Sequence, residues 1–362
     1  MTAAAAARRA SAASSSATAM LLLFVTASPA LRAVPTRAVP AAAAVARASR
    51  RRACLVCAAA PGGERQRRQR PKAKQSLGQN FLVDDALAER MAASLRRGDG
   101  DGDGRRVVEL GPGQGALTAL LLQSHPEMLA VEIDQRMVEI LRADLPALEL
   151  RHADLLGLDL AALAAERGGP LSVLTNTPFY LTSQLLFKLL GSLEQIDEVV
   201  LSMQAEVADK LLAPPRCKDY GILSVMTQLF GQPERLFEIP PHAFRPEPKC
   251  SAAVLRLRPV GAPPGSALPL SAAQRSQLLG LLKLAFEQRR KMLRVTLKPL
   301  LAAAKEPPPE EMLRLRPEQL EPAQFVQLAA MLFGDDAEAD AAAALVAAHV
   351  SESWTPWKAG WK

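Results

Sequence analysis

The chain has 362 residues, of which 49% are hydrophobic and 22% charged, so it can bury one large core or two moderate ones. Its formal net charge is +7, but residues 1–63 hold eight arginines and no Asp, Glu or Lys, so the remaining chain carries +7 − 8 = −1. The overall charge therefore gives no evidence for binding to nucleic acid.

Residues 1–63 have the composition of an organelle-targeting presequence, rich in Ala, Ser and Arg and free of acidic residues. An apolar run at 19–25, followed by small residues, resembles the core of a signal peptide and is too short to span a bilayer. A signal core followed by a transit segment would direct the protein to a plastid (chloroplast) enclosed by extra membranes, with no stable membrane association. An ordinary plastid or mitochondrial presequence that contains a chance leucine run is the alternative.

The segment 64–74 is a basic linker, with six cations between Arg65 and Lys74. Such a density of charge is typical either of a solvated linker or of an arm that grips phosphates. The sequence leaves both interpretations open.

The cysteines do not predict a metal site or a structural disulfide. Cys54 and Cys57 form a CxxC pair inside the presequence, whereas Cys217 and Cys250 stand alone. A zinc site needs a second pair of ligands, and the sequence offers none.

Short apolar strands alternate with helical stretches from Arg106 onward. Strands are expected at 107–110, 128–133, 148–153, 172–176 and 198–203, and two more at 234–239 and 252–257. This alternation predicts a Rossmann-like α/β fold with a mostly parallel, seven-stranded sheet covered by helices, and the last two strands are expected to form an antiparallel pair at its edge. The catalytic domain is predicted to span 75–260.

The sequence changes character at Gly261–Leu270, which is rich in Pro and Gly. Beyond it, helical spacing predicts one or two amphipathic helices over 274–301 and another beginning near Pro322. We therefore expect a small helical domain at 261–334, followed by a low-complexity tail at 335–362 that is predicted to be disordered.

A glycine-rich turn indicates a ligand near the first strand of the sheet. Gly111, Gly113 and Gly115 lie between a strand and a helix, where the backbone can approach a ligand and offer N–H groups. Glu132 ends the next strand, where its carboxylate can accept bonds from ribose hydroxyls, and Asp154 ends the third, where it can meet an adenine amine. Each acid alone fits a helix cap equally well. Together they predict a nucleoside-containing cofactor, and both NAD and S-adenosylmethionine remain open at this point.

The turn after the fourth strand, in LTNTPFYLTS, favours methyl transfer to an exocyclic amine. The side-chain oxygen of Asn176 and the carbonyl of Thr177 or Pro178 can accept the two amine hydrogens and orient the nitrogen lone pair. Phe179 can stack on a flipped base, a contact worth roughly 1–3 kcal/mol. The alternative is that the Asn caps a helix and the rings pack in the core.

With these motifs in order, the chain resembles the small-subunit ribosomal RNA adenine N6,N6-dimethyltransferase family from about Gln75 to Phe333. The resemblance rests on SLGQNFLVDD, VVELGPGQGALT, AVEID, ADLL, NTPF, MQAEVADKL, KDYGILSVMTQLF, FRPEPKCSA and AFEQRRKMLR. It implies the S-adenosylmethionine-dependent methyltransferase fold with S-adenosyl-L-methionine as cofactor. It further implies a monomer that acts near the 3′ end of small-subunit rRNA on the assembling small ribosomal subunit.

The resemblance also implies residue roles. Cofactor contacts are expected from Asn80, Leu82, Gly111, Gly113, Glu132, Asp154 and Asn176. Asn176, Pro178, Phe179 and Phe244 are expected to form the catalytic site, with the two rings sandwiching the target adenine. Arg289, Arg290, Lys291 and Arg294 are expected to face RNA.

The sequence departs from the family at Thr177, Tyr180 and Ala205, where the usual residues are Leu or Ile, Asn, and Lys. Activity is expected to survive because Asn176, Pro178 and Phe179 are intact, but how firmly the amine is held and whether one or two methyl groups are delivered to each adenosine stay open.

Four other functions compete with this interpretation. A mitochondrial transcription factor of the same family, or a ribosome assembly factor, would bind nucleic acid without needing methyl transfer. The large-subunit methyltransferases that confer macrolide resistance fit the helical domain less well. An oxidoreductase would need a catalytic Tyr/Lys pair or a His near the cofactor, and none of the four histidines stands beside an acid in a cofactor motif.

Overall fold

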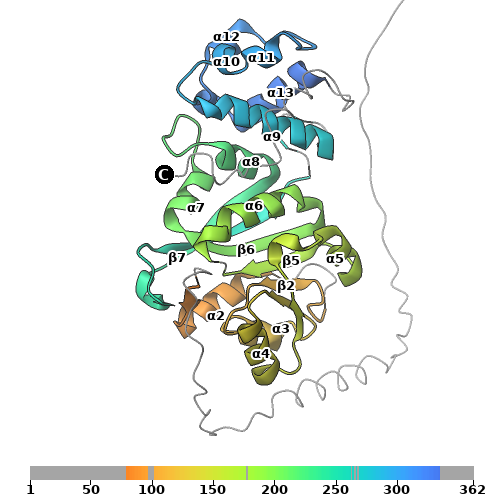
Figure 1. Cartoon of the computed structure of the whole chain (residues 1–362), viewed down its shortest axis with the longest axis vertical. Coiled ribbons are helices and arrows are strands. Elements are labelled where there is room, and N and C mark those ends of the chain that lie inside the picture. Colours follow the sequence, from red (N-terminus) through yellow and green to blue (C-terminus); the bar gives the residue numbers. More distant parts are fainter. Residues whose placement is uncertain are drawn as a thin grey trace, which may run out of the picture. The chain divides into compact units, whose positions relative to one another are not determined.

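The computed structural model describes residues 79–96, 102–176, 178–261, 263–264, 266 and 269–334 (Figure 1). The predicted presequence at 1–63, the basic linker at 64–74 and the tail at 335–362 lie outside the described residues, and so does Thr177.

A seven-stranded sheet with the order β4-β3-β2-β5-β6-β9-β7 forms the centre of the described chain. Its strands are β2 (Val107–Leu110), β3 (Leu129–Glu132), β4 (Glu149–His152), β5 (Leu171–Thr175), β6 (Ile196–Gln204), β7 (Gly231–Ile239) and β9 (Ala252–Pro259). Neighbours from β4 to β6 pair in parallel, while β9 is antiparallel to both β6 and β7. The predicted mostly parallel sheet of seven strands, with an antiparallel pair at its edge, is confirmed.

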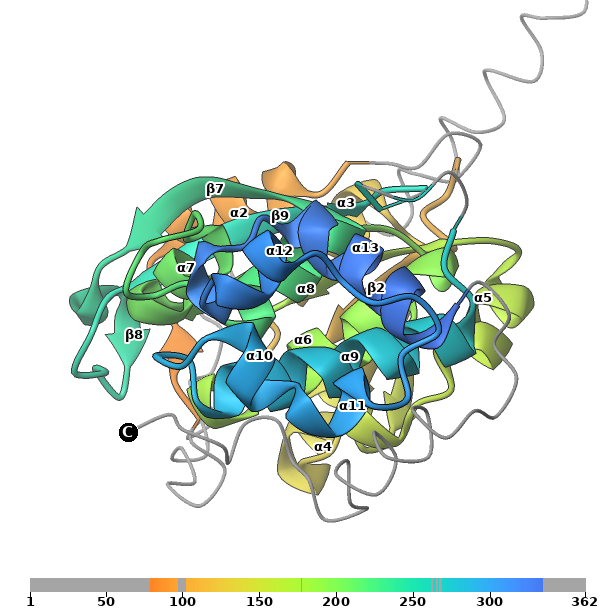
Figure 2. The same ribbon diagram turned by 90° about the horizontal axis from the view of Figure 1, so that it is seen from above.

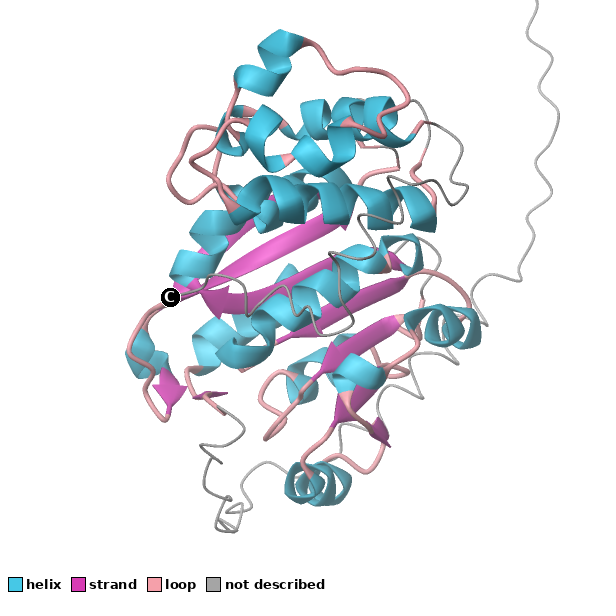
Figure 3. Ribbon diagram, turned by 45° about the horizontal axis from the view of Figure 1, so that its top comes forward, coloured by secondary structure: helices cyan, strands magenta, loops and turns pink. Residues whose placement is uncertain are grey.

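Helices cover the sheet because its central strands are apolar on both faces (Figure 3). The helices of this part are α2 (Asp85–Ser94), α3 (Thr118–Ser124), α4 (Gln135–Asp144), α5 (Leu160–Arg167), α6 (Thr182–Gly191), α7 (Ala205–Leu212) and α8 (Ile222–Phe230). One hydrophobic cluster packs α2 and α3 against the sheet, and a larger one packs α5 to α8. The strand ends that carry the predicted site residues are therefore held by a packed core on both sides.

A two-stranded sheet that the sequence did not predict joins distant parts of the chain. β1 (Phe81–Leu82) pairs antiparallel with β8 (Phe244–Arg245), and the N–H of Val83 donates to the carbonyl of Ala243 at 2.8 Å. Strands of two residues are too short to show the alternating pattern that identifies a strand. This pairing brings 80–82 next to the loop that holds Phe244.

Helices also fill the region after residue 270, as predicted. They are α9 (Ala272–Glu287), α10 (Leu293–Thr296), α11 (Lys298–Leu301), α12 (Glu310–Arg314) and α13 (Pro322–Phe333). The beginning of α13 at Pro322 confirms the prediction, but 274–301 forms three helices rather than one or two. α9 ends at Glu287, and the N–H of Leu293 at the start of α10 donates to the carbonyl of Leu315 at 2.8 Å, a tertiary contact that helical spacing does not contain.

The helical region packs on the sheet region through α8, which contacts both α9 and α13 (Figures 1 and 2). The Tyr220 hydroxyl donates to the carbonyl of Leu320 at 2.9 Å, and the N–H of Arg216 donates to the carbonyl of Glu318 at 2.6 Å. One hydrophobic cluster runs through both regions. The domain boundary at 260/261 stays a prediction.

Candidate active site

A cleft lies at the carboxyl ends of β2, β3 and β5, with an empty volume of about 840 Å³ that includes its open mouth. The chain order of the strands changes direction between β2 and β5, and ligands of open α/β sheets bind at such a point. Of the predicted site residues, those that line the cleft are Asn80, Leu82, Gly111, Gly113, Glu132, Asn176 and Pro178. The structure thus brings together residues that are up to 98 positions apart, from Asn80 to Pro178.

The glycine-rich turn after β2 forms one wall of the cleft. Gly113 has φ +54°, and a Cβ there would lie 3.0 Å from the Phe81 ring. Gly115 has φ +82°, and a Cβ there would lie 2.8 Å from a methyl group of Leu141. A side chain would be strained at either position, with a tight contact at Gly113 and a clash at Gly115, so this turn favours glycine.

Glu132 holds this turn while it faces the cleft. Its carboxylate accepts hydrogen bonds from the N–H groups of Gly113 (3.0 Å), Ile133 (2.9 Å) and Asp134 (2.8 Å). Burial raises its pKa, and these three bonds oppose the rise. A carboxylate has about four lone pairs, so Glu132 can still accept a bond from a ligand hydroxyl.

Glu109, which the sequence analysis missed, is the most perturbed acid of the cleft. It lies in β2 with 1% of its surface exposed, and its Oε2 atom has no hydrogen-bond partner among the described residues. Burial raises its pKa to about 8, opposed by the nearby Thr118 hydroxyl and helped by the Glu132 carboxyl. The available signal was an acid inside an apolar strand, two residues before the first glycine of the turn. A cation in the cleft would favour its charged form.

Asp134 ties the start of the described chain to the end of β3. It caps α4 and forms an ion pair with Arg136 (2.6 Å), and the side chain of Gln79 donates to it at 3.1 Å. The hydrogen bond from Arg136 is the main reason why its pKa is lowered to about 2. The cleft residue Gln79 is thereby fixed beside Glu132.

Asp154 does not line the cleft, although the next residue, Leu155, does. Its carboxylate accepts a hydrogen bond from the N–H of Leu156 at 2.9 Å and caps the short helix η2 (Leu155–Gly157). The capping role weighed in the sequence analysis is therefore realised, and an adenine contact would use its remaining lone pairs.

Asn176 follows β5 at the cleft and is fixed from a neighbouring strand. Its Oδ1 atom accepts a hydrogen bond from the Ser202 hydroxyl of β6 at 2.5 Å. Pro178 lines the cleft beside it, and Tyr180, one of the departures from the family, is 52% exposed there. Ala205, another departure, begins α7.

The two predicted base-stacking rings contact each other rather than flanking an open slot. The centroids of Phe179 and Phe244 are 6.4 Å apart, with their planes at 73°. Phe244 is 1% exposed, and neither ring lines the cleft. A base can lie between them only if the rings separate.

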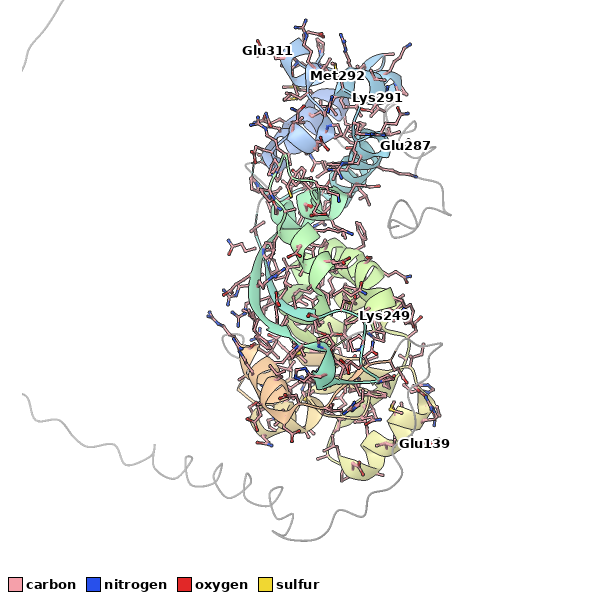
Figure 4. All side chains as sticks on the ribbon, turned by 90° about the vertical axis from the view of Figure 1, so that its left-hand side faces the viewer. Glu139, Lys249, Glu287, Lys291, Met292 and Glu311 are labelled. Carbon is pink, nitrogen blue, oxygen red and sulfur yellow. The ribbon has the colours of Figure 1, made fainter. Side chains whose placement is uncertain are left out.

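The four cations expected to face RNA are not equivalent. Arg289 donates to the Glu318 carboxylate at 3.0 Å and to the carbonyl of Lys218 at 2.7 Å, so it links the end of α9 to the α7–α8 loop. Arg290 and Lys291 are exposed, and Lys291 lies on the outer surface of the helical region (Figure 4). Arg294 is exposed and lies 3.8 Å from Glu310. None of the four lines the cleft.

The cleft fits a cationic nucleoside such as S-adenosylmethionine. The unpartnered carboxyl oxygen of Glu109 suits its positive groups, and Glu132 suits its ribose. Ile133 and Tyr180 line the same cleft although they are 48% and 52% exposed, so a planar base there would cover them. The described residues contain no group of three or more His, Cys, Asp or Glu that could hold a metal ion, and no helix among them is long and apolar enough to cross a membrane.

Comparison with known proteins decides the family. The model of the family described as "Ribosomal RNA adenine dimethylase" matches residues 70–326. The chain belongs to this family. It is therefore an rRNA adenine dimethyltransferase that uses S-adenosylmethionine.

Relatives and solved structures agree with this assignment. The chain is 43% identical over 269 residues to the ribosomal RNA small subunit methyltransferase A of Salinibacter ruber, covering 74% of this chain and 87% of the relative. It is 38% identical to the protein of that name from Pseudomonas aeruginosa, covering 72% and 95%. The crystal structure of the 23S rRNA methyltransferase ErmE matches with a TM-score of 0.50 at 25% identity, covering 70% of this chain and 99% of that one. A dimethyladenosine transferase from Plasmodium falciparum shares the fold, with a TM-score of 0.55 at 21% identity, covering 68% and 95%.

Proposed function

We propose that this family member dimethylates adenosines near the 3′ end of an organellar small-subunit rRNA, in a plastid or a mitochondrion, and thereby contributes to ribosome biogenesis. Support for the small subunit comes from the name shared by the relatives in Salinibacter ruber and Pseudomonas aeruginosa. Support for an organelle comes from the composition of residues 1–63. The assembling subunit is the proposed partner, and the protein acts on it as a monomer.

The observation that carries methyl transfer is the placement of Asn176 and Pro178 on the same cleft as Glu109 and Glu132. The acids would hold the cofactor at the ends of β2 and β3, while Asn176 lines the cleft at the end of β5. An amine held there by hydrogen bonds lies next to the cofactor, which is the arrangement that group transfer between two bound molecules requires.

When bound beside Glu109 and Glu132, S-adenosylmethionine would supply a methyl group activated by its sulfonium, with the electrons of the C–S bond left on sulfur and the proton of the amine lost to water. Asn176 accepts a hydrogen bond from the amine and orients its lone pair. Phe179 offers a face for stacking once it separates from Phe244. A strong general base is not needed, because the methyl group is already activated and positioning determines the rate.

The test combines rRNA analysis in cells with an assay in solution. Cells depleted of the protein are analysed by mass spectrometry of plastid and mitochondrial small-subunit rRNA, and loss of dimethyladenosine from one organelle identifies both substrate and location. Unmethylated small subunits of that organelle are then incubated with the purified protein and the Asn176→Ala variant. If neither organelle loses dimethyladenosine and the purified protein transfers no methyl groups, the proposal fails, and binding to nucleic acid during transcription or assembly takes its place.

A further inference from the structure

We propose that Ser202 is a positioning residue for Asn176 and that it controls how efficiently the second methyl group is delivered. This inference rests on the proposed function, because it concerns the acceptor that holds the target amine. Ser202 belongs to none of the motifs that led to the site, and it does not line the cleft.

The geometry places Ser202 directly beside Asn176. β5 and β6 are parallel neighbours with Thr175 opposite Leu201, so the next residue of each strand continues the same register. The Ser202 hydroxyl lies 2.5 Å from Asn176 Oδ1, and this is its only hydrogen bond among the described residues. Ser202 is 1% exposed, so bulk water is a poor substitute partner for its hydroxyl.

This burial determines which way the Asn176 amide faces. If the amide were flipped, the NH₂ group of Asn176 would face Ser202 and donate to its hydroxyl oxygen. The hydroxyl proton of Ser202 would then have no acceptor. A buried donor without a partner is unfavourable, so the bond selects the orientation with Oδ1 toward Ser202. A carbonyl oxygen has two lone pairs, so one remains for the target amine.

A second hydroxyl fixes the backbone just before Asn176. Thr175 donates to the carbonyl of Leu110 at 2.8 Å, and Leu110 immediately precedes Gly111 of the glycine-rich turn. The end of β5 is therefore joined to the cofactor side by Thr175 and to β6 by Ser202. Loss of the Ser202 bond would free the side chain of Asn176 while its backbone stays in place.

The second methyl transfer depends on this side chain more than the first. An unmethylated adenosine has two N–H groups, which can bond to Asn176 and to a backbone carbonyl of the turn. After one transfer, a single N–H group remains to orient the nitrogen. Imprecision in one acceptor should therefore slow the second C–N bond formation more than the first.

The experiment compares Ser202→Ala with Ser202→Cys and with Ser172→Ala. Ser172 is also a 1% exposed serine of the sheet, in the neighbouring strand β5, and it contributes nothing to the cleft. Each full-length variant is assayed on unmethylated organellar small subunits, and monomethyl and dimethyl adenosine are separated by mass spectrometry. The thermal midpoint and the affinity for S-adenosylhomocysteine are measured on the same preparations.

For Ser202→Ala we expect kcat to fall by about tenfold, the loss that corresponds to one hydrogen bond, with KM for the subunit unchanged. Monomethyladenosine accumulates, while the affinity for S-adenosylhomocysteine stays within about twofold. Ser202→Cys keeps a weak donor and retains more of the dimethyl product. Ser172→Ala behaves like the unaltered protein.

Two results would overturn the inference. One is a Ser202→Ala protein with the unaltered ratio of products and an unaltered kcat, while the parent protein is active. The other is an equal fall for Ser202→Ala and Ser172→Ala that follows the thermal midpoint, since that would show general loss of packing. A parent protein that transfers no methyl groups to plastid or mitochondrial small subunits would instead contradict the proposed function itself.

Discussion

The two sides of the cleft are built in different ways. On the cofactor side, the carboxylate of Glu132 and the turn at Gly113 are joined through backbone N–H groups, so the wall is complete without a ligand. On the side of the target base, Phe179 and Phe244 contact each other, and a base can lie between them only if they separate.

This difference suggests a division of work between the two sides. The cofactor side is preorganised, so a cofactor binds without a rearrangement of the backbone. On the base side, Phe179 and Phe244 contact each other. They separate only when a flipped adenine takes the place of one ring as the stacking partner of the other. Binding of the cofactor and capture of the base should therefore respond to different substitutions.

The largest expected effect separates the two sides most clearly. Asn176→Ala should lower kcat by about 10³-fold, because it removes an acceptor aligned with the reacting amine. Affinity for S-adenosylhomocysteine should change by less than about tenfold, since Glu109 and Glu132 remain. Single-turnover methylation and calorimetric titration measure the two quantities, and a parallel loss of both would show that Asn176 acts mainly on the cofactor.

Substitutions in the ring pair should affect stability and methylation differently. Phe244→Ala should lower the free energy of unfolding by about 3 kcal/mol, because the ring is 1% exposed and its removal leaves a cavity. Phe179→Ala, at a half-buried ring, should cost only about 1 kcal/mol but should weaken methylation. Urea unfolding compares the two variants, and equal losses of stability would contradict the view that Phe179 is the ring that moves.

Glu132→Ala should weaken binding of S-adenosylhomocysteine by about 10²-fold, since it removes a bond to the ligand and the three that hold the glycine-rich turn. Glu139→Gln, at an exposed position of the next helix, serves as the control. An affinity that stays within twofold of the control would show that the turn does not depend on this carboxylate.

The sequence predicted the strands and the glycine-rich turn because these are local patterns. Apolar runs such as 107–110 and 198–203 are short, continuous and bounded, and Glu132 stands at the end of one of them. Glu109 left a local signal, an acid inside an apolar strand, but its raised pKa depended on burial, and the role of Ser202 depended on strand register, which no local pattern contains. Within its strand Ser202 resembles any small residue, and only its place opposite Asn176 gives it a partner.

The same distinction applies to two predicted roles that stay predictions. Asp154 fits a ligand contact and a helix cap equally well in sequence; the structure shows the cap, and the adenine contact stays a prediction. Arg289 belongs to a run of cations that suits an RNA surface, yet its partners Glu318 and Lys218 come from distant segments. A charge pattern shows which residues are able to bind phosphate but not which of them are already paired.

Cofactor affinity should depend on pH through Glu109. Its raised pKa of about 8 means that the free protein keeps it protonated below that pH, whereas a bound cation needs the carboxylate. Affinity for S-adenosylmethionine should therefore rise by about tenfold from pH 6 to pH 7 and level off above pH 8. Calorimetric titration should also detect proton release on binding.

The Glu109→Gln variant tests the source of that dependence. It should bind with an affinity that varies little from pH 6 to pH 8 and is weaker than that of the unaltered protein at pH 8. An unchanged pH profile in this variant would assign the effect to Glu132, whose pKa burial also raises.

The smallest expected effect concerns two adjacent arginines and tests whether charge or pairing decides their role. Arg289→Ala should lower the free energy of unfolding by about 1 kcal/mol, because it removes a partly exposed ion pair and hydrogen bonds to two carbonyls. Arg290→Ala, at an exposed position with no ion pair among the described residues, should leave stability within about 0.5 kcal/mol.

If the exposed cation meets phosphate, Arg290→Ala should instead weaken binding to the small subunit and reduce the salt dependence of that binding by about one unit of slope. Binding titrations at several salt concentrations, beside urea unfolding, measure both effects. A loss of RNA affinity in Arg289→Ala alone would show that this residue leaves Glu318 to reach RNA, and the pairing seen in the helical region would then be a resting state of the RNA-binding surface.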